Sequence, residues 1–285
     1  MKKSSLKLMV LLGLCISGIL FSCNNEKNLS EPVKGNLQKF EDYKIFGKAH
    51  NELLSHANDH FIVTRSNNNM SLEDGLQYLA NFQKEHVNEM SIDDEAKALL
   101  KAGLDEYKDF YAQDQLYNMS LLSTRSSSEG LLKDKIGQIY EAGVIDHFEH
   151  DGLLTLCDAS LANYNGELSV AEFKAIIADL ITKWEAQHYT EESKYGRTLA
   201  IALSVSESSM DWWSENTVET RALPLWVGAD IIGAVLGAAS SVVNQLVLSD
   251  NEFSWTSLGW QTVSGAAIGS TGVVTKVGKW ISNLF

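Results

Sequence analysis

The chain has 285 residues, 45% of them hydrophobic, which is enough for one large domain or two small ones. Its formal net charge is −14. A protein this acidic repels the phosphate backbone of nucleic acids, so we expect no nucleic-acid partner.

The first 22 residues have the features of an export signal. Three lysines within the first seven residues precede an uncharged apolar run over 8–21, which is too short to span a bilayer comfortably. The run ends in Leu-Phe-Ser-Cys at 20–23, which resembles the lipobox of bacterial lipoproteins. The resemblance implies cleavage before Cys23 and lipid attachment to that cysteine, with palmitate among the acyl chains.

The predicted lipid determines where the mature protein sits. Several acyl chains anchor a protein stably, whereas one does so only marginally. The lipobox with the two asparagines after it resembles lipoproteins of Bacteroidetes, many of which are displayed on the cell surface, although only Glu26 supplies the acidic signal that tends to accompany surface export. We therefore expect a lipid anchor in the outer membrane, facing either the cell surface or the periplasm. Residues 23–35 are polar and contain Pro32, so they are predicted to be a flexible tether.

Residues 36–221 are predicted to form an acidic helical domain. Residues 222–285 carry three acidic and two basic side chains, so nearly all of the net negative charge precedes them. The clearest helix start is Ser169, which forms a capping box with Glu172 before apolar residues at helical spacing. Other helices are predicted to begin at Ser71, Ser91 and Thr190 and to cover 36–61 and 131–149. Since no segment alternates with a period of two, the predicted class is all-α, a helical bundle.

The polar connections in this region contain or adjoin Thr-Arg pairs at 64–65, 124–125 and 220–221. An exposed arginine in a loop is a natural protease site, and cleavage after Arg221 would release residues 222–285. Arginines in solvated loops are the simpler explanation.

The first predicted helix contains three histidines, and no metal is assigned to them. His56 and His60 have the i, i+4 spacing of a zinc-protease helix, but Ala57 stands where that motif needs its glutamate. His50 lies on the apolar face of the same helix. We expect His50 to be a hydrogen-bonded core histidine.

Two other stretches resemble cation sites without being assigned as such. Residues 146–151 read Asp-His-Phe-Glu-His-Asp and place His147 and His150 on one helix face beside carboxylates, an arrangement that a charged helix end also explains. Residues 161–172 are similar to an EF-hand loop, but Leu161 occupies the first ligand position. A turn between two helices explains Gly166 and the capping box without calcium.

The sequence offers no catalytic constellation. It contains no Gly-x-Ser-x-Gly elbow, P-loop, dinucleotide fingerprint or Cys-x-x-Cys pair. Cys157 is the single thiol left once the signal is removed and Cys23 is acylated, and its apolar surroundings suggest a buried hydrophobic side chain. We expect no enzymatic activity, no cofactor and no metal.

Residues 222–285 are predicted to form a Gly/Ala-rich helical hairpin. Gly233/Gly237 and Gly265/Gly269 are GxxxG pairs, which allow helix backbones to approach closely. Residues 231–248 are uncharged and barely long enough for a membrane helix. Aromatic and basic residues lie along the second helix, where they suit either a membrane interface or a hairpin that closes a bundle: Trp255, Trp260, Trp280, Lys276 and Lys279.

The hairpin resembles the glycine-zipper helices of class II bacteriocins, in composition only and over about a fifth of the chain. Together with His-Asn-Glu at 50–52 and Ser-Ser-Met-Asp-Trp-Trp at 208–213, it also resembles an uncharacterised family of Bacteroidetes lipoproteins. That family implies no activity. The expected function is a non-enzymatic interaction or structural protein of the cell envelope. The alternative is a membrane-active, bacteriocin-like protein. The expected partners are the membrane, through the lipid, and another envelope protein or a target membrane, through 222–285.

Overall fold

The computed structural model describes residues 36–64, 72–112, 125–164, 166–216 and 253–282, and ten positions between 230 and 245. Residues 1–36 and 37–285 form two separate units. The signal peptide over 1–22, Cys23, the tether over 23–35 and the boundary at 221 all fall outside the described residues. These assignments therefore stay predictions.

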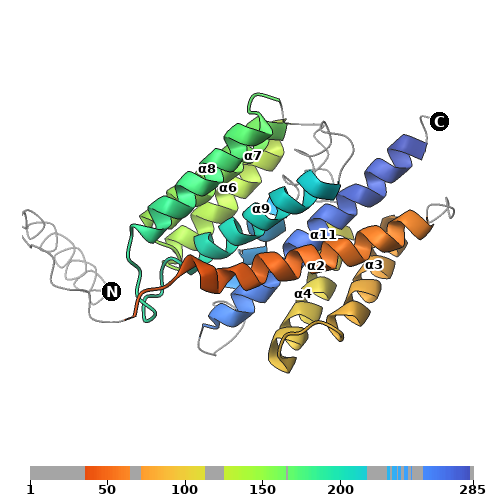
Figure 1. The fold of residues 1–285 in the computed structure, drawn as a ribbon, viewed down its shortest axis with the longest axis horizontal. Coiled ribbons are helices and arrows are strands. Elements are labelled where there is room, and N and C mark those ends of the chain that lie inside the picture. The colour runs from red at the N-terminus through yellow and green to blue at the C-terminus, as the bar shows by residue number, and fades with distance from the viewer. Residues whose placement is uncertain are drawn as a thin grey trace, which may run out of the picture. The chain divides into compact units, whose positions relative to one another are not determined.

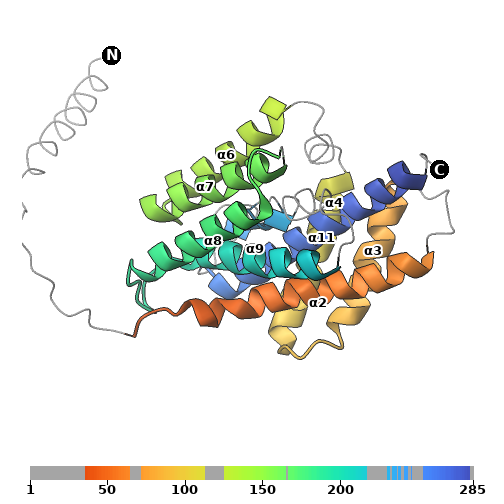
Figure 2. The ribbon, with the colours of Figure 1, turned by 45° about the horizontal axis from the view of Figure 1, so that its top comes forward.

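The described part of residues 37–285 is an all-α helical bundle, as the sequence predicts. Helices α6, α7 and α8 lie on one side and α3 and α4 on the other, with α2, α9 and α11 between them (Figures 1 and 2). The labelled helices are α2 (Phe40–Thr64), α3 (Leu72–Val87), α4 (Asp94–Ala112), α6 (Arg125–Glu141), α7 (His147–Tyr164), α8 (Val170–Glu185), α9 (Arg197–Asn216) and α11 (Trp255–Ser282).

Helix starts in this bundle are set by side chains that bind free backbone N–H groups. The capping box predicted for α8 is present: the Ser169 hydroxyl accepts a hydrogen bond from the Glu172 N–H, and the Glu172 carboxylate accepts one from the Ser169 N–H. Helix α4 is capped by Asp93, which accepts a bond from the Ala96 N–H at 2.7 Å. Ser91, the predicted start of α4, therefore lies before its cap.

The helix predicted over 131–149 is wrong, because a helix stop lies within it. Helix α6 ends at Glu141, and Gly143 has a positive φ of 67°. The N–H groups of Gly143 and Val144 bond back to the carbonyls of Tyr140 and Ile139, the pattern of a Schellman stop. Apolar side chains keep a helical spacing on both sides of the stop, so Gly143 was the local sequence signal that the helix ends there.

The helix start predicted at Thr190 is also wrong. Thr190 forms an isolated antiparallel bridge with Leu37, and Gly196 has a φ of 95°. The Gln38 side chain donates to the Thr190 carbonyl at 2.7 Å. Because these residues tie the chain entering α2 to the chain entering α9, α9 begins later, at Arg197.

The C-terminal hairpin pairs its two helices in antiparallel orientation. A Cβ built on Gly233 would meet the backbone of Gly265 and Ala266, whereas one on Gly237 would lie 2.6 Å from the Gln261 carbonyl oxygen. The two backbones thus run against each other with no side chain between them. Glycine is required here by the close approach of the two chains.

Helix α11 lies in the centre of the bundle, against α2, α3, α4 and α9. Trp260 is 3% exposed, and its ring packs edge-on against Phe46 of α2 with centroids 5.2 Å apart. Ser264 donates to the Leu100 carbonyl of α4 at 3.0 Å. Trp260 therefore belongs to the core of the bundle. Of the two roles that the sequence left open, a membrane interface or a hairpin that closes the bundle, it takes the latter. The Trp280 side chain lies outside the described residues.

Within the described residues, every helix is either too short or too polar to cross a lipid bilayer.

Replacing Gly237 with alanine is expected to destabilise the fold by about 1–3 kcal/mol, because the new methyl group would overlap the backbone of α11. Gly137 in α6 is a matched control, since a Cβ there meets nothing within 4 Å. Gly137→Ala should be neutral or stabilise by up to about 1 kcal/mol. Urea unfolding of both variants measures the difference, and equal midpoints would contradict the close packing of the hairpin.

Candidate functional site

Two carboxylates, Asp230 and Glu149, lie at 0% exposure within the bundle. A buried carboxylate costs several kcal/mol unless hydrogen bonds or an opposite charge compensate it. The groups that surround each carboxylate therefore show what it does.

Asp230 joins the hairpin to α9 and α2. Ser209 and Trp213, one turn apart on α9, both donate to its Oδ2, the indole Nε1 from 2.9 Å. Its Oδ1 lies 3.5 Å from Nε2 of His50 on α2. His50 and Ser209 are fully buried and Trp213 is 3% exposed. We call Asp230, His50, Ser209 and Trp213 the aspartate cluster.

Small and polar residues continue the seam between α2 and α9. The Asn51 side chain donates to the Ser208 carbonyl at 2.8 Å and its oxygen lies 3.2 Å from Nδ1 of His50. The Ser204 hydroxyl donates to the Tyr43 carbonyl at 2.8 Å and accepts from the Gly47 N–H at 3.2 Å. The aspartate cluster is thus the end of a continuous polar seam that fixes how α2 and α9 align.

The aspartate cluster contains Ser, His and Asp, but it is not arranged for nucleophilic catalysis. A serine nucleophile needs the histidine to accept its proton, with the aspartate behind the histidine. Here Ser209 donates directly to the aspartate, and Nδ1 of His50 faces Asn51. The geometry pairs a buried carboxylate with two donors from α9 and with His50 of α2, and so binds three segments of the fold together.

Glu149 connects the start of α7, on which it lies, to the start of α9. Its Oε2 accepts from the Asp146 N–H at 3.3 Å, and Asp146 Oδ1 accepts from the Glu149 N–H at 2.9 Å, which forms a capping box for α7. Its Oε1 accepts from the Leu199 N–H in the first turn of α9 at 3.3 Å. Burial raises the pKa of Glu149 to about 7, against the backbone hydrogen bonds that lower it.

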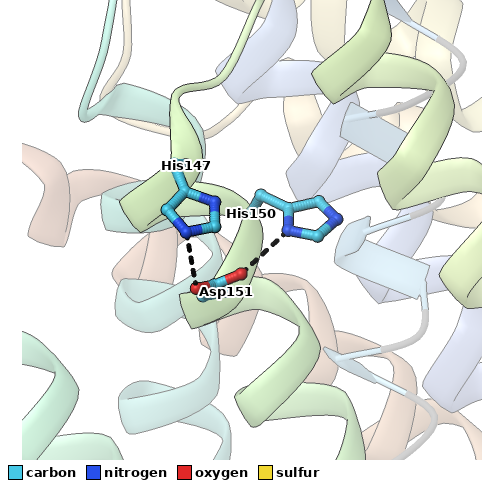
Figure 3. A group of neighbouring side chains, drawn as sticks. All are labelled: His147, His150 and Asp151. Atoms are coloured by element: carbon cyan, nitrogen blue, oxygen red, sulfur yellow. Dashed lines mark hydrogen bonds and ion pairs between the residues drawn. The ribbon is translucent and has the colours of Figure 1, made fainter. Parts of the chain in front are cut away.

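Two histidines and an aspartate lie together on the surface, at the start of α7. His147 Nε2 lies 3.4 Å from one oxygen of Asp151, and His150 Nδ1 lies 3.0 Å from the other (Figure 3). All three side chains come from one helix face, as predicted for His147 and His150. We call these three residues the α7 histidine cluster.

The other candidate residues take structural positions. The His56 ring stacks between Phe82 and His86 of α3, and the His60 side chain lies outside the described residues. Cys157 is 2% exposed, as its apolar surroundings suggest. In the EF-hand-like stretch, Gly166 has a φ of 73° and follows α7 in a turn that leads to the Ser169 cap.

Asp230 is the buried carboxylate that sequence reasoning missed. It is the single charged residue between 222 and 249, and a lone carboxylate in such a run needs a buried partner. The burial of His50 was predicted, but nothing local indicated that the two residues meet.

Comparisons of the chain with models of protein families, with curated proteins and with solved structures found no match.

The raised pKa of Glu149 makes the stability of the bundle depend on pH. Between the unfolded pKa near 4.5 and the folded pKa of about 7, the native state keeps a proton that the unfolded chain releases. The free energy of unfolding should therefore fall as the pH rises through this window, by on the order of 3 kcal/mol, and level off above it.

Glu149→Gln stays uncharged, so this part of the slope should disappear. Urea unfolding between pH 5 and 8, in buffer containing a metal chelator, measures the slope. Glu85, an exposed glutamate of α3, provides the control Glu85→Gln. A slope that Glu149→Gln leaves unchanged would show that Glu149 does not titrate in this window.

Proposed function

We propose that the chain is a lipid-anchored, non-catalytic interaction protein of the bacterial cell envelope. The anchor is inferred from the export signal and the lipobox that ends in Cys23. The observation that carries the non-catalytic role is the aspartate cluster. Its Ser, His and Asp side chains are fully buried and used to join helices.

The surface of the bundle suits recognition through charge. Nearly all of the negative charge lies before residue 222, on helices whose apolar faces are buried in the core. Such a field attracts cationic surfaces and raises association rates. We therefore infer a partner with a basic face, held near the membrane that carries the lipid.

A membrane-active role would use the hairpin, whose Gly/Ala composition favours it. Against that role, Ile231, Val242, Val263 and Ile268 of the hairpin are at most 1% exposed, and Asp230 is bonded to α9. Insertion would have to break these contacts and expose the same apolar area on the remaining helices. Burial of a single such side chain is worth about 1.5–3 kcal/mol, so the packed hairpin strongly favours the interaction role.

The anchor can be tested by expressing the full chain in a bacterial host fed an alkyne-labelled palmitate. The wild-type protein should carry the label and fractionate with membranes. Cys23→Ser should abolish the label, whereas the control Cys157→Ser should keep it, because the Cys157 thiol is buried. Absence of label on the wild type would remove the lipid anchor from the proposal.

The same labelled protein, reconstituted with dye-filled vesicles, separates the two roles. An interaction protein should leave the vesicles intact. Dye release by the wild type that Gly237→Ala changes would replace the proposal with the membrane-active role.

A further inference from the structure

The α7 histidine cluster has the composition of a metal site. Two imidazoles and one carboxylate are the ligands that zinc, nickel and copper ions share, whereas magnesium and calcium prefer sites made of oxygen alone. The residues follow the pattern His147, His150, Asp151, so they occupy neighbouring places on one helix face, at i, i+3 and i+4.

The distances in the cluster suit coordination. Two ligands bound about 2.1 Å from a tetrahedral ion lie about 3.4 Å apart. The His147 and Asp151 ligand atoms are 3.4 Å apart, the His150 and Asp151 atoms are 3.0 Å apart, and all three lie within 4.8 Å of one another. Small side-chain rotations would bring the three atoms around one ion, with Asp151 between the two histidines as in Figure 3.

The surroundings favour a cation and keep the cluster accessible. The side chains of His147 and Asp151 are 76% and 57% exposed, so an ion can reach them directly. The Tyr140 ring packs against the His150 ring with centroids 4.7 Å apart, which restricts its rotation. The Asp146 carboxylate caps the same turn and adds an acidic group next to the site.

We propose that His147, His150 and Asp151 bind one divalent ion of the zinc class through His147 Nε2, His150 Nδ1 and an Asp151 oxygen. Water completes the coordination, since the protein supplies three ligands from one helix. An exposed site of this kind binds more weakly than a buried four-ligand site and keeps an open position. The bound ion would link His147, the first residue of α7, to His150 and Asp151 one turn later, and would stabilise the start of that helix.

Hydrogen bonds alone also explain the contacts of Asp151 with the two imidazoles. The two explanations differ in where the proton sits: a hydrogen bond keeps a proton on the ring nitrogen that faces Asp151, whereas a metal ion needs that nitrogen without its proton. Zinc binding that depends on these side chains therefore distinguishes the two explanations.

The test is calorimetric titration of zinc ions into the full chain, kept in detergent, purified without a metal-binding tag and stripped with a chelator. We expect saturable binding that includes one site dependent on this cluster. His150→Gln and Asp151→Asn should each weaken that site at least about tenfold, because even residues that only support a ligand are worth 10–100-fold. Magnesium in excess should not compete.

The control Asp158→Asn removes the same charge from the same helix, at a carboxylate that pairs with Lys133 of α6. It should leave zinc affinity unchanged, and circular dichroism should show that all variants keep their helices. Two results would overturn the proposal: no saturable zinc binding by the wild type, or an affinity that His150→Gln and Asp151→Asn change no more than Asp158→Asn does.

Discussion

Asp230 imposes the constraint on which the arrangement of the bundle depends. It is a charged side chain at 0% exposure, so the fold must supply partners for it or lose several kcal/mol. Those partners, Ser209, Trp213 and His50, come from helices that precede it in the chain. The hairpin therefore cannot dock on α9 and α2 in a shifted register without leaving the carboxylate unpaired.

Close backbone contact complements this electrostatic constraint. The glycines of the hairpin bring the 230–245 segment against α11, and Gly47 brings α2 against Ser204 and Ser208 of α9. Such contacts allow α11 to pass through the middle of the bundle, where Trp260 and Ser264 contact α2 and α4. The Gly/Ala composition that resembles membrane-active peptides is used here for packing between helices of one protein. This use supports the proposed interaction role, in which the acidic outer helices face a partner.

Local features of the fold were predictable from the sequence, and features that join distant segments were not. The capping box at Ser169 was confirmed, because both of its partners lie within one turn. The stop at Gly143 and the bridge at Thr190 contradicted predicted helices, since apolar spacing alone does not reveal a left-handed glycine or a pairing with Leu37. The α7 histidine cluster was found in sequence because a helix face has a fixed period. The aspartate cluster was not found in the sequence, because its residues meet only when α2, α9 and the hairpin pack together.

The role of Asp230 can be measured by amide hydrogen exchange along the full chain, comparing the wild type with Asp230→Ala. In the wild type, residues 255–269 should be as protected as α2 and α9. In Asp230→Ala they should exchange about 100-fold faster or more, because the partners of the carboxylate are left unpaired in the core. Asp211→Ala, which removes an exposed carboxylate paired with Lys174, should change little. A hairpin that exchanges freely in the wild type, or one whose protection is unchanged in Asp230→Ala, would contradict the central role of this carboxylate.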